Sequence, residues 1–341
     1  MTIDLRSDTV TRPTPSMRKA MANAEVGDDV YREDRLVQQL EDQAAQMLGK
    51  EAGLLLPSGT MGNLVAVLAC CQRGDEIIME DQMHMFWYEV AGIAALAGVQ
   101  IRTIPGSKGV VDSQQVSEAI RGVDIHFPQT RMLCLENTHN RAGGTCLSKE
   151  QMDQLCAVAR QAGLWVHVDG ARIFNAAVAV DCMPSDLVAG ADSVMFCLSK
   201  GLAAPVGSLL VGPREFIERS RKCRKMLGGG MRQAGVLAAA GLVSLSEMLP
   251  RLSEDHHTAR VLATGLADLG AEVDMDSVQT NIVRYKLSMP AMDFAAHLAD
   301  KGILAGVTGP DSIRMVTHYE VKPEDIDRVL VAASAILKQA R

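Results

Sequence analysis

The stretch Val166-His167-Val168-Asp169-Gly170-Ala171-Arg172 joins a short apolar run to a carboxylate and a guanidinium. Such a run is consistent with a strand buried on both faces of a parallel sheet. In open α/β sheets the ligand site lies beyond the carboxyl ends of the strands. The stretch therefore predicts an α/β fold whose functional side chains gather where this strand ends.

Similar apolar runs recur on both sides of this stretch, and helical patterns separate most of them. The expected strands are Gly53–Pro57, Glu76–Met79, Val99–Ile104, Met132–Leu135, Leu164–Val168, Ser193–Leu198 and Ser208–Val211. The expected helices are Leu36–Leu48, Gly62–Cys71, Glu89–Leu96, Gln114–Ile120 and Gln151–Ala162, the last with a capping box of Ser148 and Gln151. This alternation predicts a mostly parallel or mixed sheet sandwiched by helices.

The pattern changes after about Val243, where strands become fewer. The expected elements are helices at Ala259–Leu269, Met292–Lys301 and Pro323 to about Lys338, with strands at Thr280–Tyr285 and Ile313–Thr317. Such a series is typical of a small α+β domain. We therefore expect an N-terminal segment over residues 1–14, a large α/β domain over 15–243 and a small C-terminal α+β domain over 244–341.

Composition narrows the class of protein. The 341 residues are 48% hydrophobic and 22% charged with a net charge of -7, so we expect a soluble protein without nucleic acid or membrane as partner. The N-terminus lacks the apolar core of a secretory signal, and no apolar run of about 18 residues is evident, which favours the cytoplasm. The eight cysteines show no metal-ligand spacing, so no metal site is expected.

Three pieces of the sequence suggest chemistry. Ser58-Gly59-Thr60 opens a helix after a strand, as a phosphate site requires, although an ordinary helix start looks the same. Asp169 suits a protonated pyridine nitrogen, with a metal or a salt bridge as alternatives. Lys200 follows the apolar strand Ser193–Leu198, where an amine at the rim of a dry pocket condenses with aldehydes, although most lysines are simply exposed.

The order of these pieces is that of fold-type I pyridoxal-phosphate enzymes, and the chain closely resembles the low-specificity L-threonine aldolases of the β-eliminating lyase group. The matching stretches are Asp4–Thr14 (DLRSDTVTRPT), Val26–Tyr31 (VGDDVY), Pro57–Leu64 (PSGTMGNL), Leu135–Asn140 (LENTHN), His167–Ala179 (HVDGARIFNAAVA), Cys197–Gly212 (CLSKGLAAPVGSLLVG) and Arg224–Gly241 (RKMLGGGMRQAGVLAAAG). They extend from the N-terminus through the large domain.

The resemblance implies a role for each matching residue. In the cofactor site it assigns the phosphate to Ser58, Gly59 and Thr60 with Arg232 of a neighbouring subunit, the pyridine nitrogen to Asp169, the Schiff base to Lys200 and ring stacking to His84. In the substrate site the resemblance assigns the binding of the substrate carboxylate to Arg172, Arg314 and Ser7. It also places Arg172 beside the cofactor, and Tyr31 in the substrate site facing the cofactor.

The implied reaction is retro-aldol cleavage of L-threonine, L-allo-threonine and related β-hydroxy-α-amino acids to glycine and an aldehyde. The cofactor is pyridoxal 5'-phosphate. Either His139 or His84 removes the β-hydroxyl proton, and the sequence does not choose between them. The family further implies a homotetramer built from dimers that share active sites.

Some positions depart from the family pattern. Trp87 stands where a second histidine is common, which predicts a bulkier wall beside the β-substituent. Arg32 and Arg35 replace a frequent glycine and proline, and Cys223 stands where tryptophan is common. These departures leave side-chain preference and threo/erythro selectivity open.

Other functions remain in competition at this stage. An aminotransferase, a β-eliminating lyase, a racemase or a phenylserine-preferring aldolase needs the same lysine, aspartate and phosphate turn. Glu136–Asn140 favours the aldolase pattern over the aminotransferase. A non-catalytic homologue is a further alternative, whereas a nicotinamide dehydrogenase is disfavoured because no Gly-x-Gly-x-x-Gly follows the first strand.

Overall fold

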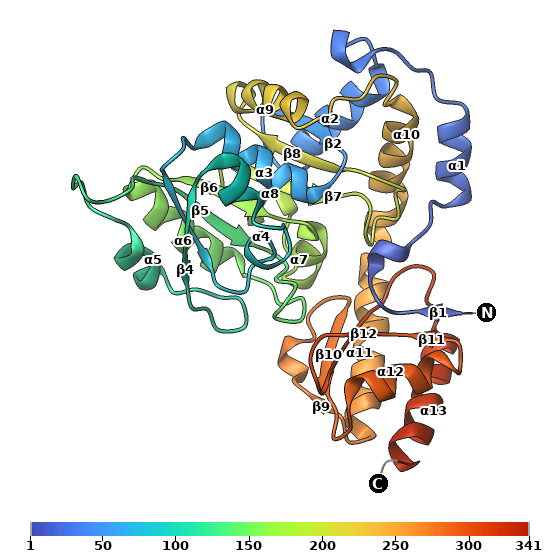
Figure 1. The fold of residues 1–341 in the computed structure, drawn as a ribbon. Coiled ribbons are helices and arrows are strands. Elements are labelled where there is room, and N and C mark those ends of the chain that lie inside the picture. Colours follow the sequence, from blue (N-terminus) through green and yellow to red (C-terminus); the bar gives the residue numbers. More distant parts are fainter. Residues whose placement is uncertain (1, 340–341) are drawn as a thin grey trace.

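The computed structural model describes residues 2–339, whose backbone forms a large sheet and two smaller ones (Figure 1). The large sheet has seven strands in the order β2-β8-β7-β6-β5-β3-β4. They are β2 (Ala52–Leu56), β3 (Glu76–Glu80), β4 (Gln100–Ile104), β5 (Thr130–Glu136), β6 (Trp165–Asp169), β7 (Ser193–Cys197) and β8 (Ser208–Gly212). Among the described strands of this sheet, β8 runs antiparallel to both of its neighbours, β2 and β7, and the other pairs are parallel. The mostly parallel sheet and its seven predicted strands are confirmed.

Helices cover both faces of this sheet because successive strand residues point to opposite sides. On one face Leu54 and Leu56 pack with Phe216, whereas Leu55 belongs to the main core on the other face. The helices of this part are α1 (Pro15–Ala22), α2 (Arg35–Met47), α3 (Gly59–Cys70), α4 (His84–Trp87), α5 (Ser113–Ala119), α6 (Lys149–Gln161), α7 (Ile173–Ala179), α8 (Pro184–Leu187), α9 (Arg214–Met226) and α10 (Gly235–Val243). The predicted capping box of Ser148 and Gln151 begins α6.

The predicted helix Glu89–Leu96 is only partly present, because its first residues form a turn. Helix α4 ends at Trp87, Val90 and Ala91 both have φ of 53°, and a π-helical turn follows over Ile93–Ala97. The reason lies in Glu89, which is 4% exposed and turns its carboxylate inward to His84 and Asn63. The apolar spacing of this segment indicates that it is buried, but it does not show the path of the backbone. The backbone bends here and brings the carboxylate of Glu89 into the interior.

The smaller part follows a long helical run. It contains α11 (Leu252–Asp268), β9 (Glu272–Val273), β10 (Ile282–Lys286), α12 (Ala291–Ala299), β11 (Ile303–Leu304), β12 (Gly306–Val307), β13 (Ser312–Val316) and α13 (Pro323–Gln339). Its antiparallel sheet has the order β12-β13-β10-β9. The predicted helices and strands of this region are present, with α11 beginning seven residues earlier than expected because the chain stays helical from Gly235.

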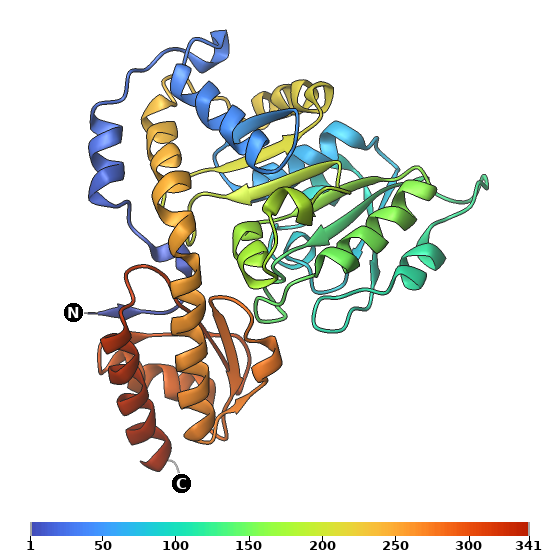
Figure 2. The same ribbon diagram turned by 180° about the vertical axis from the view of Figure 1, so that it is seen from behind.

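The N-terminal residues join the small part rather than standing alone. Strand β1 (Ile3–Asp4) pairs in parallel with β11, and Ile3 and Leu5 belong to the core of the small part (Figure 2). The expected boundary between residues 243 and 244 falls inside the continuous helical run Gly235–Asp268. The division 1–14, 15–243 and 244–341 therefore stays a proposal.

That helical run is long and apolar enough to cross a membrane by length and composition alone. Half of its most apolar window is buried inside the protein, however, and Arg251 lies within the run. This burial is typical of a core helix, which agrees with the absence of a clear apolar span in the sequence.

Candidate functional site

The functional residues expected from the sequence gather at the carboxyl end of the large sheet. Asp169 is the last residue of β6, and Lys200 lies in the turn three residues after β7. The N-terminus of α3 follows β2 at the same edge. Parallel strands deliver these groups to one region because their carboxyl ends coincide.

Asp169 is held by a buried network of polar side chains. Its Oδ2 accepts a 3.0 Å hydrogen bond from Asn63 Nδ2, and Oδ1 accepts one of 3.1 Å from the N–H of Ala171. Asn63 Nδ2 also donates to Glu89 Oε1 at 2.8 Å, and Glu89 Oε1 lies 3.0 Å from His84 Nδ1. Sequence analysis missed Asn63 and Glu89, although Asn63 stands inside one of the quoted family stretches.

A second layer behind Asn63 fixes the positions of the protons. Trp165 Nε1 can only donate, and it does so to Ser193 Oγ at 2.9 Å. The amide N–H groups of Asn63 face the carboxylates of Asp169 and Glu89, so its Oδ1 accepts a 3.1 Å hydrogen bond from His167 Nε2. Burial lowers the pKa of His167 to about 4, so its ring is neutral at physiological pH. With the proton on Nε2, the neutral ring accepts through Nδ1, so the Ser193 hydroxyl donates to it at 2.9 Å.

The cluster of His84, Glu89 and Asp169 carries buried negative charge. Their ligating atoms lie within 4.8 Å of one another. Burial, together with the charge of Asp169, raises the pKa of Glu89 even though its bond to His84 opposes this. Burial alone would lower the pKa of His84, but Glu89 and Asp169 raise it. A cation facing Asp169, either a pyridinium or a metal ion, fits this imbalance.

The phosphate turn is a helix N-terminus with free donors. Ser58 caps α3 by accepting a 3.2 Å bond from the N–H of Met61, and Ser58 and Thr60 are exposed. No hydrogen bond from the N–H of Gly59 or Thr60 is found among residues 2–338. A Cβ at Gly59 would lie 2.9 Å from Cys197 Sγ, so glycine is needed here for α3 to pack against β7.

Lys200 is half-buried in a tight turn. Its carbonyl oxygen accepts bonds from Thr11 Oγ1 at 2.9 Å and from the N–H of Ala203 at 2.8 Å. Ala203 has φ of 59°, which closes the turn. The turn therefore holds the backbone of Lys200 while its amine takes part in none of the hydrogen bonds found among residues 2–338.

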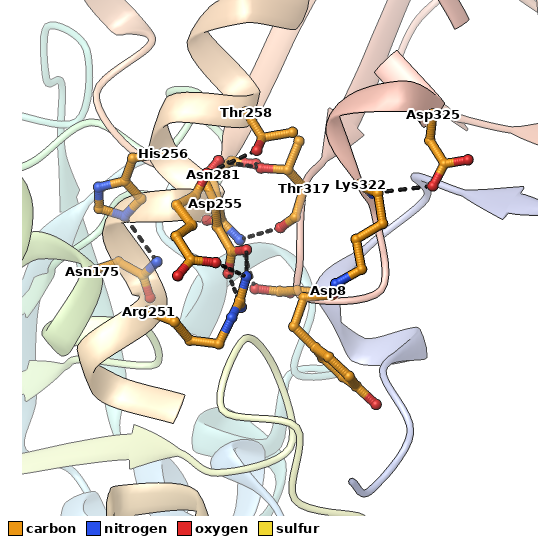
Figure 3. A network of polar contacts seen from close by, with 12 residues as sticks. Asp8, Asn175, Arg251, Asp255, His256, Thr258, Asn281, Thr317, Lys322 and Asp325 are labelled. Atoms are coloured by element: carbon orange, nitrogen blue, oxygen red, sulfur yellow. Dashed lines mark hydrogen bonds and ion pairs between the residues drawn. The ribbon is translucent and has the colours of Figure 1, made fainter. Parts of the chain in front are cut away.

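Arg172 is bound by an acid that sequence analysis did not single out. Its Nε and Nη2 donate to the two oxygens of Asp8 at 2.7 and 2.6 Å, and both side chains are buried. Asn281 of the small part donates to Asp8 at 3.1 Å and to the carbonyl of Thr317 at 3.0 Å (Figure 3). Although burial opposes it, Arg172 lowers the pKa of Asp8 far below its usual value. Asp8 thus occupies Nε and Nη2 of the Arg172 guanidinium, which leaves Nη1 for a ligand.

Arg314 reaches the same region from β13. Its Nη1 donates to Asn140 Oδ1 at 3.0 Å and its Nη2 to the carbonyl of Arg6 at 3.2 Å. Its Nε is buried without a hydrogen-bond partner among the described residues. Burial and the charge of Arg172 lower the pKa of Arg314. Ser7, half-buried, caps the adjacent 3₁₀ turn η1 (Asp8–Val10).

The two candidate histidines differ in what they leave free. His139 is 2% exposed, its Nε2 lies 3.0 Å from Glu80 Oε2, and its Nδ1 accepts a 3.1 Å bond from the N–H of Ala142. Both of its nitrogens are therefore engaged. His84 uses Nδ1 for Glu89, its side chain is 31% exposed, and no bond of its Nε2 is found among residues 2–338.

Two predicted residues lie apart from this cluster in the single chain. Tyr31 is 73% exposed, and Arg232 is an exposed residue whose Nη1 lies 3.0 Å from Asp28 Oδ2. The N–H of Asp29 donates to the carbonyl of Arg232, so the two loops lie side by side. Their predicted contacts to cofactor or substrate remain proposals.

The departures from the family pattern other than Trp87 lie at surface or packing positions, although Arg32 has φ of 58°, in the left-handed region that glycine favours. Arg32 pairs with Glu218 on the surface, Arg35 opens α2, and Cys223 is half-buried on α9. Trp87 instead donates through Nε1 to the carbonyl of Asp81 at 2.8 Å and places its ring 4.3 Å from the guanidinium of Arg141.

Comparison with known proteins identifies relatives along the whole chain. A family described as beta-eliminating lyase matches residues 4–288. Low-specificity L-threonine aldolase 1 of Arabidopsis thaliana is 45% identical over 337 residues, covering 96% of this chain and 94% of that protein.

Two solved structures share the fold at low sequence identity. Threonine aldolase from Leishmania major superposes with a TM-score of 0.86 at 18% identity, covering 98% of this chain and 99% of that one. A structure described as SPT with a PLP internal aldimine has a TM-score of 0.79 at 18% identity, covering 99% and 88%. The likeness is one of fold, and it extends over both parts of the chain.

Proposed function

Because the chain belongs to the beta-eliminating lyase family, we propose that it is a pyridoxal-phosphate-dependent aldolase that cleaves L-threonine and related β-hydroxy-α-amino acids to glycine and an aldehyde. The observation that carries this proposal is the meeting of buried Asp169, half-buried Lys200 and the open N-terminus of α3 at one edge of the large sheet. L-allo-threonine is included among the substrates on the family resemblance.

The residues of this edge fit pyridoxal phosphate. The excess negative charge of Asp169 and Glu89 is matched by a protonated pyridine nitrogen, and the free N–H groups of Gly59 and Thr60 suit a phosphate beside Ser58. Lys200 would supply the amine that binds the cofactor, and His84 would face its ring. When bound, the cofactor accepts the electron pair of the bond that breaks at Cα.

The protein's own side chains determine which bond at Cα breaks. Arg172 and Arg314, with Ser7, would hold the substrate carboxylate, which would restrict rotation about the Cα–N bond and so select the Cα–Cβ bond for cleavage. Asp8 keeps Arg172 in place by occupying its Nε and Nη2. Orientation therefore decides cleavage in place of transamination.

We assign the removal of the β-hydroxyl proton to His84 rather than to His139. Within the described part of the chain, His84 Nε2 has no hydrogen-bond partner, whereas both nitrogens of His139 are engaged. Glu89 accepts the Nδ1 proton of His84 and so orients the basic nitrogen outward. His139 then acts as a support for the loop that carries Asn140.

The test of the proposed function is to remove the amine of Lys200 by substitution. Lys200→Ala is expected to abolish glycine formation from L-threonine, a loss of about 10⁴-fold or more, because no other side chain replaces a covalent amine. Lys222→Ala, an exposed lysine on α9, serves as the matched control. Borohydride reduction followed by peptide mapping should place the pyridoxyl label on Lys200. A label elsewhere, or full turnover by Lys200→Ala, refutes the assignment.

We further propose a cytoplasmic homotetramer whose dimers share active sites. Arg232 and Tyr31 are exposed in the single chain, which suits contacts across a subunit boundary. Light scattering gives the mass of the assembly. Arg232→Ala should lower cofactor affinity, measured by equilibrium dialysis, only where subunits are associated.

A further inference from the structure

A cavity of about 220 Å³ beside Arg314 is lined by three arginines. Arg141, Arg284 and Arg314 surround it together with Asn140, Tyr88 and Thr308. None of the described residues that line it is acidic. Arg314 thus lines this cavity and also lies near Arg172, whose charge contributes to lowering the pKa of Arg314.

Two of these arginines are direct neighbours across antiparallel strands. Arg284 of β10 is paired in register with Arg314 of β13, so both side chains emerge on the same face of the small sheet. Like charges opposite each other on a sheet are destabilising. Burial and the charge of Arg141 lower the pKa of Arg284, and Arg284 in turn contributes to lowering that of Arg314.

The hydrogen bonds of all three go to uncharged partners. Arg141 donates to Gln82 Oε1 at 3.0 Å and to the Tyr88 hydroxyl at 2.8 Å, and Arg284 donates to the carbonyl of Arg141. None of the ion pairs found among residues 2–338 includes Arg141, Arg284 or Arg314. The protein therefore gathers three positive charges without neutralising them.

The nearby acids are already engaged. On the other side of Arg284 a second cavity is lined by Asp274 and Glu272. Asp274 lies 2.6 Å from Lys108 Nζ, and Glu272 lies 3.6 Å from Lys286 Nζ. The arginine cavity thus keeps its charge even though carboxylates exist in the neighbourhood.

Arg141 is held in place by aromatic rings rather than by an acid. Its guanidinium lies 4.3 Å from the ring of Trp87 and 5.8 Å from that of Tyr88. Such stacking orients a guanidinium and leaves its charge available to a ligand. Trp87, a departure from the family pattern, therefore has a structural role toward Arg141.

We propose that this cavity receives an acidic group on the β-carbon of the substrate, so that the preferred substrates are β-hydroxy-α-amino acids with a second carboxylate. The smallest is 3-hydroxyaspartate. Arg172 and Arg314 take the α-carboxylate under the proposed function, on which this inference rests, and Arg141 and Arg284 remain for the second anion. Planar guanidinium forks suit carboxylates in this arrangement.

The reaction stays a retro-aldol cleavage and is balanced without an oxidant or reductant. The Cα–Cβ bond of 3-hydroxyaspartate breaks as the base takes the hydroxyl proton. The electron pair remains with Cα, which is then protonated to give glycine. The β-carbon leaves as the aldehyde of glyoxylate, whose carboxylate lies among the arginines.

The experiment compares 3-hydroxyaspartate with its amide 3-hydroxyasparagine of the same stereochemistry, since the two differ mainly in charge. Glycine release by the holoenzyme is expected to give a kcat/KM at least about tenfold higher for the acid. Arg284→Gln and Arg141→Gln should each reduce this preference severalfold while changing L-threonine cleavage by less than about threefold. Lys108→Gln, a cation of the neighbouring cavity, is the matched control and should keep the preference.

A binding measurement separates this inference from the proposed function. L-aspartate and L-asparagine carry no β-hydroxyl, and calorimetry should show tighter binding of L-aspartate that is lost in Arg284→Gln. That result together with no aldol cleavage would overturn the proposed function alone. Equal kcat/KM for acid and amide in the parent protein, equal losses on all substrates, or a change of oligomeric mass in the variants would overturn the anion site.

Discussion

Around Asp169 the protein supplies its own hydrogen-bond partners, whereas around Arg314 it leaves guanidinium nitrogens without acidic partners. The Asp169 side is continuous from Trp165 through His167 and Asn63 to His84, with each proton position determined by its neighbour. The Arg314 side gathers like charges in register. On the Asp169 side, hydrogen bonds within the chain fix one geometry, and the negative charge left over suits a cationic ring. On the Arg314 side the unneutralised charge is positive and suits an anion.

Asp8 lies where the two sides meet, and its loss is expected to have the largest effect on stability. Asp8→Asn leaves the buried guanidinium of Arg172 without a charged partner, which costs about 3–5 kcal/mol. The urea midpoint of unfolding measures the loss. Asp4→Asn is the control, because Asp4 pairs with the exposed Arg6. Equal midpoints for both variants would mean that the Asp8 pair contributes little, and the contrast between the two sides would be weaker.

The Asp169 side also predicts which histidine acts as the base. His84→Asn should lower kcat about a hundredfold, and His139→Asn less than tenfold with a loss of stability. Because Glu89 raises the pKa of His84 and the neutral ring is the base, activity should rise with pH through a pKa above about 6.5. Glu89→Gln should move this rise to lower pH. An unmoved profile would exclude His84 from the role.

Acid should weaken the Asp169 side. His167 is neutral in the folded protein, with its pKa lowered to about 4 by burial, whereas an unfolded histidine titrates near about 6.5. The unfolded chain therefore binds the additional proton between these values, and stability falls as the pH drops through this window. At pH 5 the loss from His167 is about 2 kcal/mol. Urea midpoints at pH 7.5 and pH 5 measure it, and His167→Gln should show a smaller difference than the parent protein.

The smallest effect concerns how the Arg314 side holds its charge. Trp87→Leu removes the ring under Arg141, worth about 0.5–1 kcal/mol, so the preference for 3-hydroxyaspartate over its amide should fall two- to fivefold. Trp87→Phe keeps a ring and is the matched control. An unchanged preference in Trp87→Leu would show that Arg141 is positioned without the stacking.

The sequence predicts the Asp169 side better than the Arg314 side for physical reasons. Buried strands leave apolar runs, and the groups at their ends follow from strand order, which is why Asp169 and Lys200 were found. Arg141 and Arg284 belong to no motif, since only folding brings residues of two parts of the chain to one cavity. Asp8 and Asn63 stood in quoted stretches, but their roles depend on distant partners.

Short strands were missed for a similar reason. Strands β1, β9, β11 and β12 have two residues each, too few for any periodicity to appear. The turn after α4 was predicted as a helix because apolar spacing does not reveal the inward-facing Glu89. Pairing and buried charge, rather than local preference, decide the structure at these positions.

The pairing of β1 with β11 has a consequence for how the polypeptide is made. Ile3 is synthesised 300 residues before its partner Ile303. The strand must therefore wait, with its apolar side chains uncovered, until the residues between the two partners have been synthesised. Closing a contact over 300 positions also carries a large loss of chain entropy, which places this step late in maturation.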